Sequence, residues 1–234
     1  MRSASLSPAV VDDIPQSAPP NDEWAAKREV AAAIRRLSSV LASSRPSIDA
    51  LRAAASTINA LADSWEQCPR LYGRHEFCAQ GSLGNYAQIT GETAAMHGQS
   101  NPIAPPVYTR IDRENGVSYG HATPGWQYEG PPGTVHGGII ASIMDNFLGV
   151  TQSLCGQTGV TGTLKLRYHA RTPLNARLTM KGWVEKSEGR KTITKGLMFF
   201  GDTLTAEAEA LFIVPQGGMA GLNAPAGAGS AKQS

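Results

Sequence analysis

Apolar residues recur every three or four positions in two stretches near the start of the chain, which is the spacing of amphipathic helices. The first stretch runs from Trp24 to Leu41, and the second begins at Ser47, a residue type that commonly caps a helix. Residues 67–106 have many Gly, Pro and polar residues and no sustained period. The pattern therefore predicts two helices within residues 22–65, followed by a long loop or lid region.

The pattern changes from residue 107 onward. Two short strands, 107–112 and 117–122, are predicted on either side of Asn115-Gly116, a favourable hairpin turn. The next segment has apolar residues at helical spacing and is predicted to form a helix that continues to about Gly156. Its apolar positions are 139, 140, 143, 144, 147, 148 and 154.

Residues 160–170 alternate strictly between the two faces of a strand, which predicts a half-buried strand. Thr161 falls on its polar face and Tyr168 on its apolar face. Further strands are expected on either side of turns at 187–190 and 201–203, and alanines in the last strand would let a sheet close tightly on a helix. One apolar helix flanked by antiparallel hairpins predicts an α+β fold in which a sheet wraps a helix.

The length and composition suit either one large domain or one ordinary domain with an extension. The chain has 234 residues, 41% of them hydrophobic, which is enough for a proper core. Its two ends are rich in Ser, Pro, Gly and Ala and are predicted to be disordered. We therefore divide the chain into a disordered start (1–21), a helical extension with the loop or lid region (22–104), an α+β domain (105–215) and a disordered tail (216–234).

The charge and cysteine content argue against several function classes. A formal net charge of +2, without a block of Lys or Arg, gives no reason to expect nucleic acid as a partner. The three cysteines are odd in number and lack metal-site spacing, so neither a metal nor another cofactor is expected, and a reducing compartment is the simpler interpretation. No apolar run of about 18 residues is available to span a bilayer. These features favour a soluble, cytoplasmic protein.

The stretch EGPPGTVHGGIIASIMDNF, residues 129–147, is the first candidate for chemistry. The first N–H groups of a helix have no intrahelical partner and lie at the positive end of its dipole. Gly137 and Gly138 would therefore hold a developing oxyanion with little steric hindrance. The alternative is an ordinary glycine turn with His136 as the helix cap.

Asp145 lies on the side of this helix opposite to the apolar stripe, where its neighbours are Ala141, Ser142, Gly149 and Gln152. It is either a solvated aspartate or, if this face of small residues is an interface, a desolvated carboxylate suited to activating water. Gly137 and Asp145 are eight residues apart, about 12 Å along a helix, so one helix cannot place both beside a single carbonyl. Two subunits packed about a dyad would form two identical sites.

Basic residues follow on the predicted strands. Arg167 belongs to the polar face of the 160–170 strand, and the next hairpin supplies Arg190 and Lys191. Such a basic face is either simply solvated or binds a substrate that carries phosphate groups.

Four stretches in this order resemble the hotdog-fold acyl-CoA thioesterases of the phenylacetate-degradation (PaaI) type, within the 4-hydroxybenzoyl-CoA thioesterase superfamily. They are EGPPGTVHGGIIASIMD, TGTLKLRYHARTP, VEKSEGRKTI and LTAEAEALFIVP. The resemblance covers residues 105–215. It implies a hotdog fold, dimers whose sheets join, and hydrolysis of an acyl-CoA to the acid and free CoA.

The resemblance also implies roles for individual residues. Asp145 corresponds to the general base or nucleophile, and His136 and Gly137 correspond to the pair that binds and polarises the thioester carbonyl. Thr161 corresponds to a hydroxyl that helps to place the water. Arg190 and Lys191 correspond to positions that contact the CoA phosphates. Beyond the resemblance, Gly138 at the helix start and Arg167 on the basic strand face are further candidates for substrate binding.

One position departs from the pattern, and two other functions remain open. Some relatives have Asn or Gln six residues before the histidine, as a second donor to the carbonyl, but this chain has Gly130 there, beside Glu129. The alternatives are an enoyl-CoA hydratase or dehydratase of the same fold and a hotdog domain that binds acyl-CoA as a sensor without turnover. The acyl group and the choice between dimer and tetramer are left open.

Overall fold

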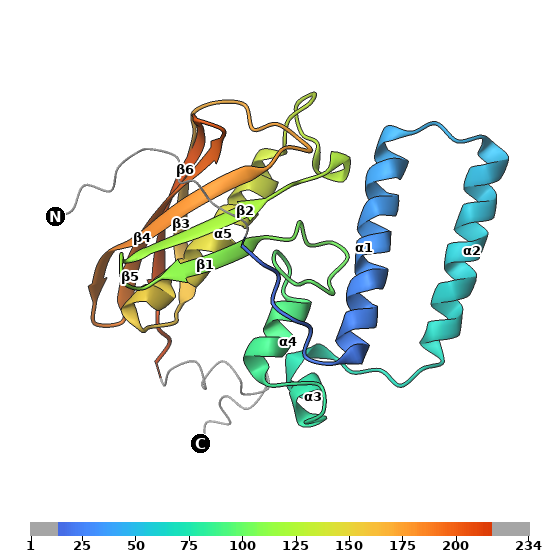
Figure 1. Ribbon diagram of the computed structural model, residues 1–234, viewed down its shortest axis with the longest axis horizontal. Helices are drawn as coiled ribbons and strands as arrows, with labels where there is room; N and C mark the ends of the chain where they lie inside the picture. The colour runs from blue at the N-terminus through green and yellow to red at the C-terminus, as the bar shows by residue number, and fades with distance from the viewer. Residues whose placement is uncertain (1–13, 217–234) are drawn as a thin grey trace, which may run out of the picture. The chain divides into compact units, whose positions relative to one another are not determined.

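The computed structural model describes residues 14–216, which form two compact units (Figure 1). One unit comprises mainly residues 107–124 and the chain from 128 onward, and the other comprises residues 16–106 and 125–127. The disorder predicted for both ends falls largely outside the described residues. Among residues 14–216, no helix is both long and apolar enough to cross a bilayer.

The unit that begins at residue 107 is a six-stranded antiparallel sheet with one long helix on one face (Figure 1). The strands follow the order β1-β2-β4-β5-β6-β3, so that β3 forms one edge of the sheet. This arrangement confirms the predicted α+β fold and its hairpins. The elements are β1 (Tyr108–Asp112), β2 (Val117–Ala122), α5 (Gly137–Thr151), β3 (Val160–Tyr168), β4 (Leu178–Glu188), β5 (Lys191–Phe200) and β6 (Thr203–Ile213).

Small residues let α5 lie close against the sheet. A Cβ atom on Gly182 of β4 would lie 2.9 Å from the Phe147 ring, and one on Gly196 of β5 would lie 2.9 Å from Leu148. Gly182 and Gly196 are paired across the two strands, and Gly196 pairs in turn with Ala208 of β6. Ala208 and the neighbouring alanines of β6 are buried, as predicted. The sheet therefore wraps the apolar side of α5.

The strict alternation predicted for residues 160–170 is wrong at the start of β3. Thr161 pairs with Phe212, but Thr163 pairs with Leu211, so an irregularity at Gly162 shifts the register. A β-bulge of this kind reverses the face on which the following residues lie. Thr161 consequently faces α5, whereas Thr163 lies on the face of the sheet away from the helix.

The helical unit confirms the two predicted N-terminal helices and corrects the loop prediction that followed them. Ser47 caps the second helix, and its side chain accepts a hydrogen bond from the Ala50 N–H. Residues 67–106 contain two helices too short to show a clear hydrophobic period. The Asn85 and Gln88 pair forms a capping box, a local signal that would have located the second of these. The helices are α1 (Asp22–Ser43), α2 (Ile48–Glu66), α3 (Gly73–Ala79) and α4 (Tyr86–Thr93).

Buried polar contacts hold α1 against the segments that follow α3. The Trp24 indole N–H donates to the Leu83 carbonyl at 2.7 Å. The Arg28 guanidinium donates to the Glu92 carboxylate of α4, which also accepts a hydrogen bond from the Ser100 hydroxyl. Glu92 is only 1% exposed, and a buried carboxylate requires such a partner.

Candidate active site

His136 caps α5 and determines which amides at the helix start are free. Its Nδ1 atom accepts a hydrogen bond from the Gly138 N–H at 3.0 Å, so the ring proton of neutral His136 lies on Nε2. The His136 carbonyl accepts from Ile139 and Ile140. The Gly137 N–H is the first of the helix and has no acceptor among the described residues. The expectation that both Gly137 and Gly138 offer bare amides is therefore wrong for Gly138.

Tyr168, at the end of β3, contacts the same turn. Its hydroxyl donates to the Gly137 carbonyl oxygen at 2.9 Å. The peptide group between Gly137 and Gly138 is thus held at both polar atoms, by Tyr168 and by His136. Tyr168 was not among the predicted site residues, although a tyrosine on the apolar face of a strand is a signal, since its hydroxyl needs a partner.

Asp145 and Thr161 form the second part of the site. The Thr161 hydroxyl donates to the Asp145 carboxylate at 2.9 Å, a contact that the bulge in β3 makes possible. Asp145 is half-buried on the side of α5 away from the apolar stripe, as expected. Gln152, expected on the same open side, is instead buried, and its amide is bonded to the backbone of Gly159.

The two parts of the site lie at opposite ends of β3 and on separate turns of α5. Gly137 contacts Tyr168 at the end of the strand, while Asp145 contacts Thr161 at its beginning. Eight residues of helix separate Gly137 from Asp145, about 12 Å. A single chain therefore does not bring Asp145 to the Gly137 N–H.

The turn before α5 leaves no room for a side chain at residue 130. A Cβ atom on Gly130 would lie 2.6 Å from the Cα of His136, and the Gly130 N–H donates to Thr134 at 2.9 Å. Glu129 accepts a hydrogen bond from the Gly133 N–H at 2.7 Å, which holds the turn. The amide donor that some relatives have at this position has no counterpart here.

Arg190 and Lys191 lie at the same end of the sheet as Thr161. Lys191 of β5 and Val160 of β3 both pair with Ile213 of β6, one from each side. Two strand spacings separate their Cα atoms by about 10 Å. Arg190 and Lys191 are exposed and available to a ligand that approaches this end.

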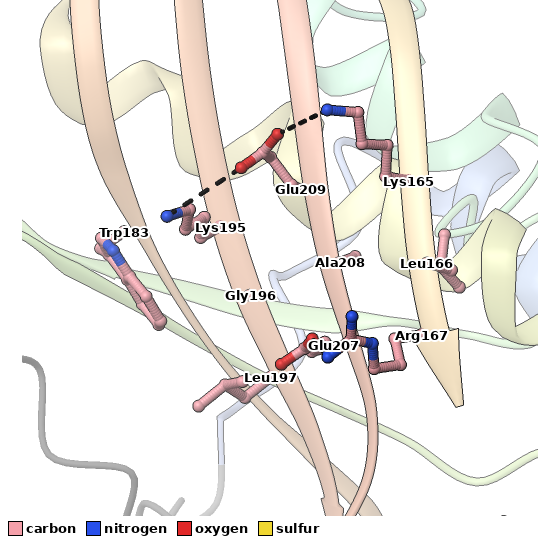
Figure 2. A pocket seen from close by; sticks show the side chains of 10 residues that line it. All are labelled: Lys165, Leu166, Arg167, Trp183, Lys195, Gly196, Leu197, Glu207, Ala208 and Glu209. Carbon is pink, nitrogen blue, oxygen red and sulfur yellow. Dashed lines mark hydrogen bonds and ion pairs between the residues drawn. The ribbon is translucent and has the colours of Figure 1, made fainter. Parts of the chain in front are cut away.

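Arg167 lies elsewhere, on the face of the sheet away from α5. It pairs with Glu207 at 3.7 Å, and Figure 2 shows it beside a row in which Glu209 lies between Lys165 and Lys195. The structure does not bring Arg167 to Asp145. On this face the charges are largely paired with one another, so the substrate-binding expectation for Arg167 has no geometric support within one chain.

Glu185 belongs to the same outer face. The pKa of its carboxyl lies below its usual value because the Trp183 indole N–H donates to it and because Lys195 lies beside it.

No group of His, Cys, Asp and Glu side chains within residues 14–216 is arranged to hold a metal ion.

Comparison with known proteins finds similarity that centres on the sheet unit. Residues 132–199 match the family model of the thioesterase superfamily. The chain is 41% identical over 93 residues to the acyl-coenzyme A thioesterase THEM4 of Xenopus laevis, which covers 38% of this chain and 41% of that protein. It is 31% identical over 87 residues to THEM5 of Homo sapiens, which covers 37% of this chain and 35% of that protein. The chain thus spans about two fifths of the length of these relatives.

One solved structure resembles more of the chain. A crystal structure of a thioesterase superfamily protein matches with a TM-score of 0.67 and 28% identity, and it covers 86% of this chain and 97% of that chain. This coverage is too large for the sheet unit alone. The likeness therefore includes part of the helical unit.

Proposed function

We propose that this chain, whose residues 132–199 match the family model of the thioesterase superfamily, hydrolyses an acyl-CoA thioester to a carboxylic acid and free CoA. The observation that carries the proposal is the hydrogen bond from Thr161 to Asp145, in a chain whose α5 also begins with a free Gly137 N–H. The names of the matched relatives, which are acyl-coenzyme A thioesterases, support the substrate class.

Each step of the reaction has a residue to perform it. Asp145 takes a proton from water, and the resulting hydroxide attacks the carbonyl carbon of the thioester. The Gly137 N–H stabilises the negative charge that forms on the carbonyl oxygen, and the Nε2–H of His136 is a second donor available for it. The C–S bond then breaks, the carboxylic acid is released, and the CoA thiolate takes the proton from Asp145. Thr161 keeps the carboxylate of Asp145 in position.

The reaction requires two copies of the chain, because Gly137 and Asp145 of one copy are too far apart. The edge strand β3 offers unpaired backbone groups to a second copy. If two β3 strands pair antiparallel about a dyad between Leu164 and Lys165, the Tyr168 end of one lies beside the Thr161 end of the other. The Gly137 N–H of one copy then faces Asp145 of its partner. The proposed assembly is therefore a homodimer with two sites.

The phosphate groups of CoA would bind at Arg190 and Lys191. Both side chains are exposed, and both lie at the end of the sheet where Thr161 contacts Asp145. We leave Arg167 out of the proposed site, because it lies on the opposite face of the sheet in an ion pair with Glu207.

The first test replaces the proposed base. We expect Asp145→Asn to lower kcat about 100-fold or more, because removal of a general base commonly has an effect of this size. The asparagine has the same shape and still accepts the Thr161 hydrogen bond. Release of free thiol from short, medium, long and aromatic acyl-CoAs measures the effect, with Asp202→Asn, in an exposed turn, as the matched control.

Two outcomes would contradict the proposal. Near-normal turnover by Asp145→Asn would exclude this carboxylate as the base. Binding of acyl-CoA by the wild-type chain without release of thiol from any of the substrates would assign the chain to the sensor class instead.

A further inference from the structure

Helix α2 is exposed along its whole length. Every residue from 41 to 70 is exposed, and α2 buries none of its side chains. The helix has 19 residues and a distinct apolar side. In proteins most of the stability of a helix comes from packing of its apolar face. The structure therefore leaves an apolar surface that lacks its packing partner.

Six apolar residues of α2 are spaced alternately three and four positions apart, as in the seam of a coiled coil, and Leu61, which is 49% exposed, lies beside this row. The six are Ile48, Leu51, Ala55, Ile58, Ala62 and Trp65. The four large ones are between 40% and 67% exposed. Helix α1 has a stripe of the same kind, with exposed residues at Val30, Ile34, Leu37 and Leu41.

The stripe on α2 is complementary to itself when two copies lie antiparallel. A dyad at the middle of the helix, between Ser56 and Thr57, places Leu51 against Ala62 of the second copy and Ile58 against its Ala55. In the middle of the seam large side chains then face small ones, and at each end Ile48 faces Trp65 of the second copy, which is how helix interfaces fill space.

The charges at the two ends of α2 fit the same arrangement. Arg45 lies just before the helix and Glu66 is its last residue. In the antiparallel pair, Arg45 of one copy lies beside Glu66 of the other, at both ends of the seam. Opposite charges that flank a coiled-coil seam set the partner and its orientation. The segment 217–234 of the same chain fits less well as a partner, since its large apolar residues are only Met219 and Leu222.

We propose that α2 is an interface that binds α2 of a second copy of this chain in antiparallel orientation. The α1 helices of the two copies would complete a four-helix bundle with their own stripes. This contact is separate from the proposed pairing of β3 strands and does not depend on the proposed hydrolysis. A chain that made both contacts would assemble beyond the dimer.

Light scattering of the purified full chain tests the interface. We expect Ile58→Glu to halve the mass of the wild-type assembly, because a carboxylate would be buried in the seam. The matched control is Ala60→Glu, which places the same charge on the opposite side of α2 and should leave the mass unchanged. Thiol release by Ile58→Glu should stay at the wild-type level if hydrolysis occurs at the site formed by α5 and β3. Absence of thiol release from the wild-type chain would contradict the proposed function but would not affect the mass measurement that tests the interface.

Several results would overturn the interface. One is an equal mass for the wild-type chain and Ile58→Glu, and another is a monomeric wild-type chain. If α2 instead packs on α1 of its own chain, Ile58→Glu will lower the thermal midpoint without any change in mass, which also contradicts the proposal. Leu51→Glu, at the other end of the seam, repeats the test with an independent variant, and far-UV circular dichroism verifies that each variant is folded.

Discussion

Tyr168 and His136 together immobilise one peptide group at the start of α5. Tyr168 holds its carbonyl oxygen and His136 holds its N–H, both at hydrogen-bond distance. The Gly137 N–H belongs to the preceding peptide group, whose His136 carbonyl accepts hydrogen bonds from Ile139 and Ile140, so both peptide groups that flank the Gly137 Cα are held. A catalytic amide must be oriented before the charge develops, because reorientation during the reaction would forfeit its effect. Tyr168 is therefore a positioning residue of the proposed site.

We expect Tyr168→Phe to lower kcat about 2- to 10-fold, the equivalent of one hydrogen bond of about 0.5–1.5 kcal/mol. KM for acyl-CoA should change little, because the ring remains in place. Steady-state thiol release measures both constants, and Tyr72→Phe, at an exposed tyrosine outside the site, is the control. An increase in KM with unchanged kcat would mean that Tyr168 binds the substrate rather than orients the amide.

At the scale of elements, the distance between α5 and the sheet is set by residues without side chains. A Cβ atom on Gly182 would lie within 3.0 Å of the Ser118 hydroxyl, the Phe147 ring and the Thr151 hydroxyl. Phe147 and Thr151 are fully buried. These neighbours have little room to move, because protein interiors are close-packed.

We expect Gly182→Ala to lower the free energy of unfolding by about 1–3 kcal/mol, the usual effect of overpacking a core. Urea denaturation of the purified chain measures this change. Gly91→Ala in α4 is the control, since a Cβ atom there would have no neighbour within 4 Å. Equal unfolding midpoints for the two variants would show that α5 is free to move away from the sheet.

Elements with a long, regular period could be predicted from the sequence. The hairpins, α5 and the first two helices were located by spacing together with turn and cap residues, because their hydrophobic faces repeat over several turns or pairs. α3 and α4 were missed because one or two turns contain too few apolar positions to establish a period. The bulge in β3 was missed because a single extra residue leaves no compositional signal beyond Gly162 itself.

The site was predictable in part, for a similar reason. The motif located the helix start and Asp145, but no pattern in the sequence predicts that the imidazole of His136 accepts a hydrogen bond from the Gly138 N–H. That contact depends on the ring's rotamer, which the fold determines. Thr161 was expected to serve the site by resemblance alone, and the alternation of its strand placed it on the wrong face.

At the scale of the whole molecule, the proposed mechanism assigns the two parts of the site to different copies. This can be tested with a pair of defective chains. Gly137→Pro removes the amide proton, and proline is well tolerated at the first position of a helix. The extended ψ of 135° at His136 is also compatible with a following proline.

Mixtures of Gly137→Pro and Asp145→Asn chains should regain activity. A mixed dimer contains one site with both residues intact, so random reassociation of equal amounts should restore about one quarter of wild-type turnover. Thiol release after joint refolding measures the recovery, and each variant refolded alone provides the background. A mixture no more active than its components would place the complete site within one chain.

The contact between Gly130 and His136 also restricts how this protein can evolve. A single substitution of Gly130 by Asn or Gln would not give this protein the amide donor that some relatives have, because any Cβ atom at residue 130 would collide with the backbone of His136. The turn from 130 to 135 would first have to move away from His136, which would break the hydrogen bonds of Gly130 and His136 that now hold it. A change from Gly130 to a side-chain donor therefore requires a rearranged loop. An intermediate sequence would have neither the hydrogen-bonded turn that Gly130 allows nor a correctly placed side-chain donor.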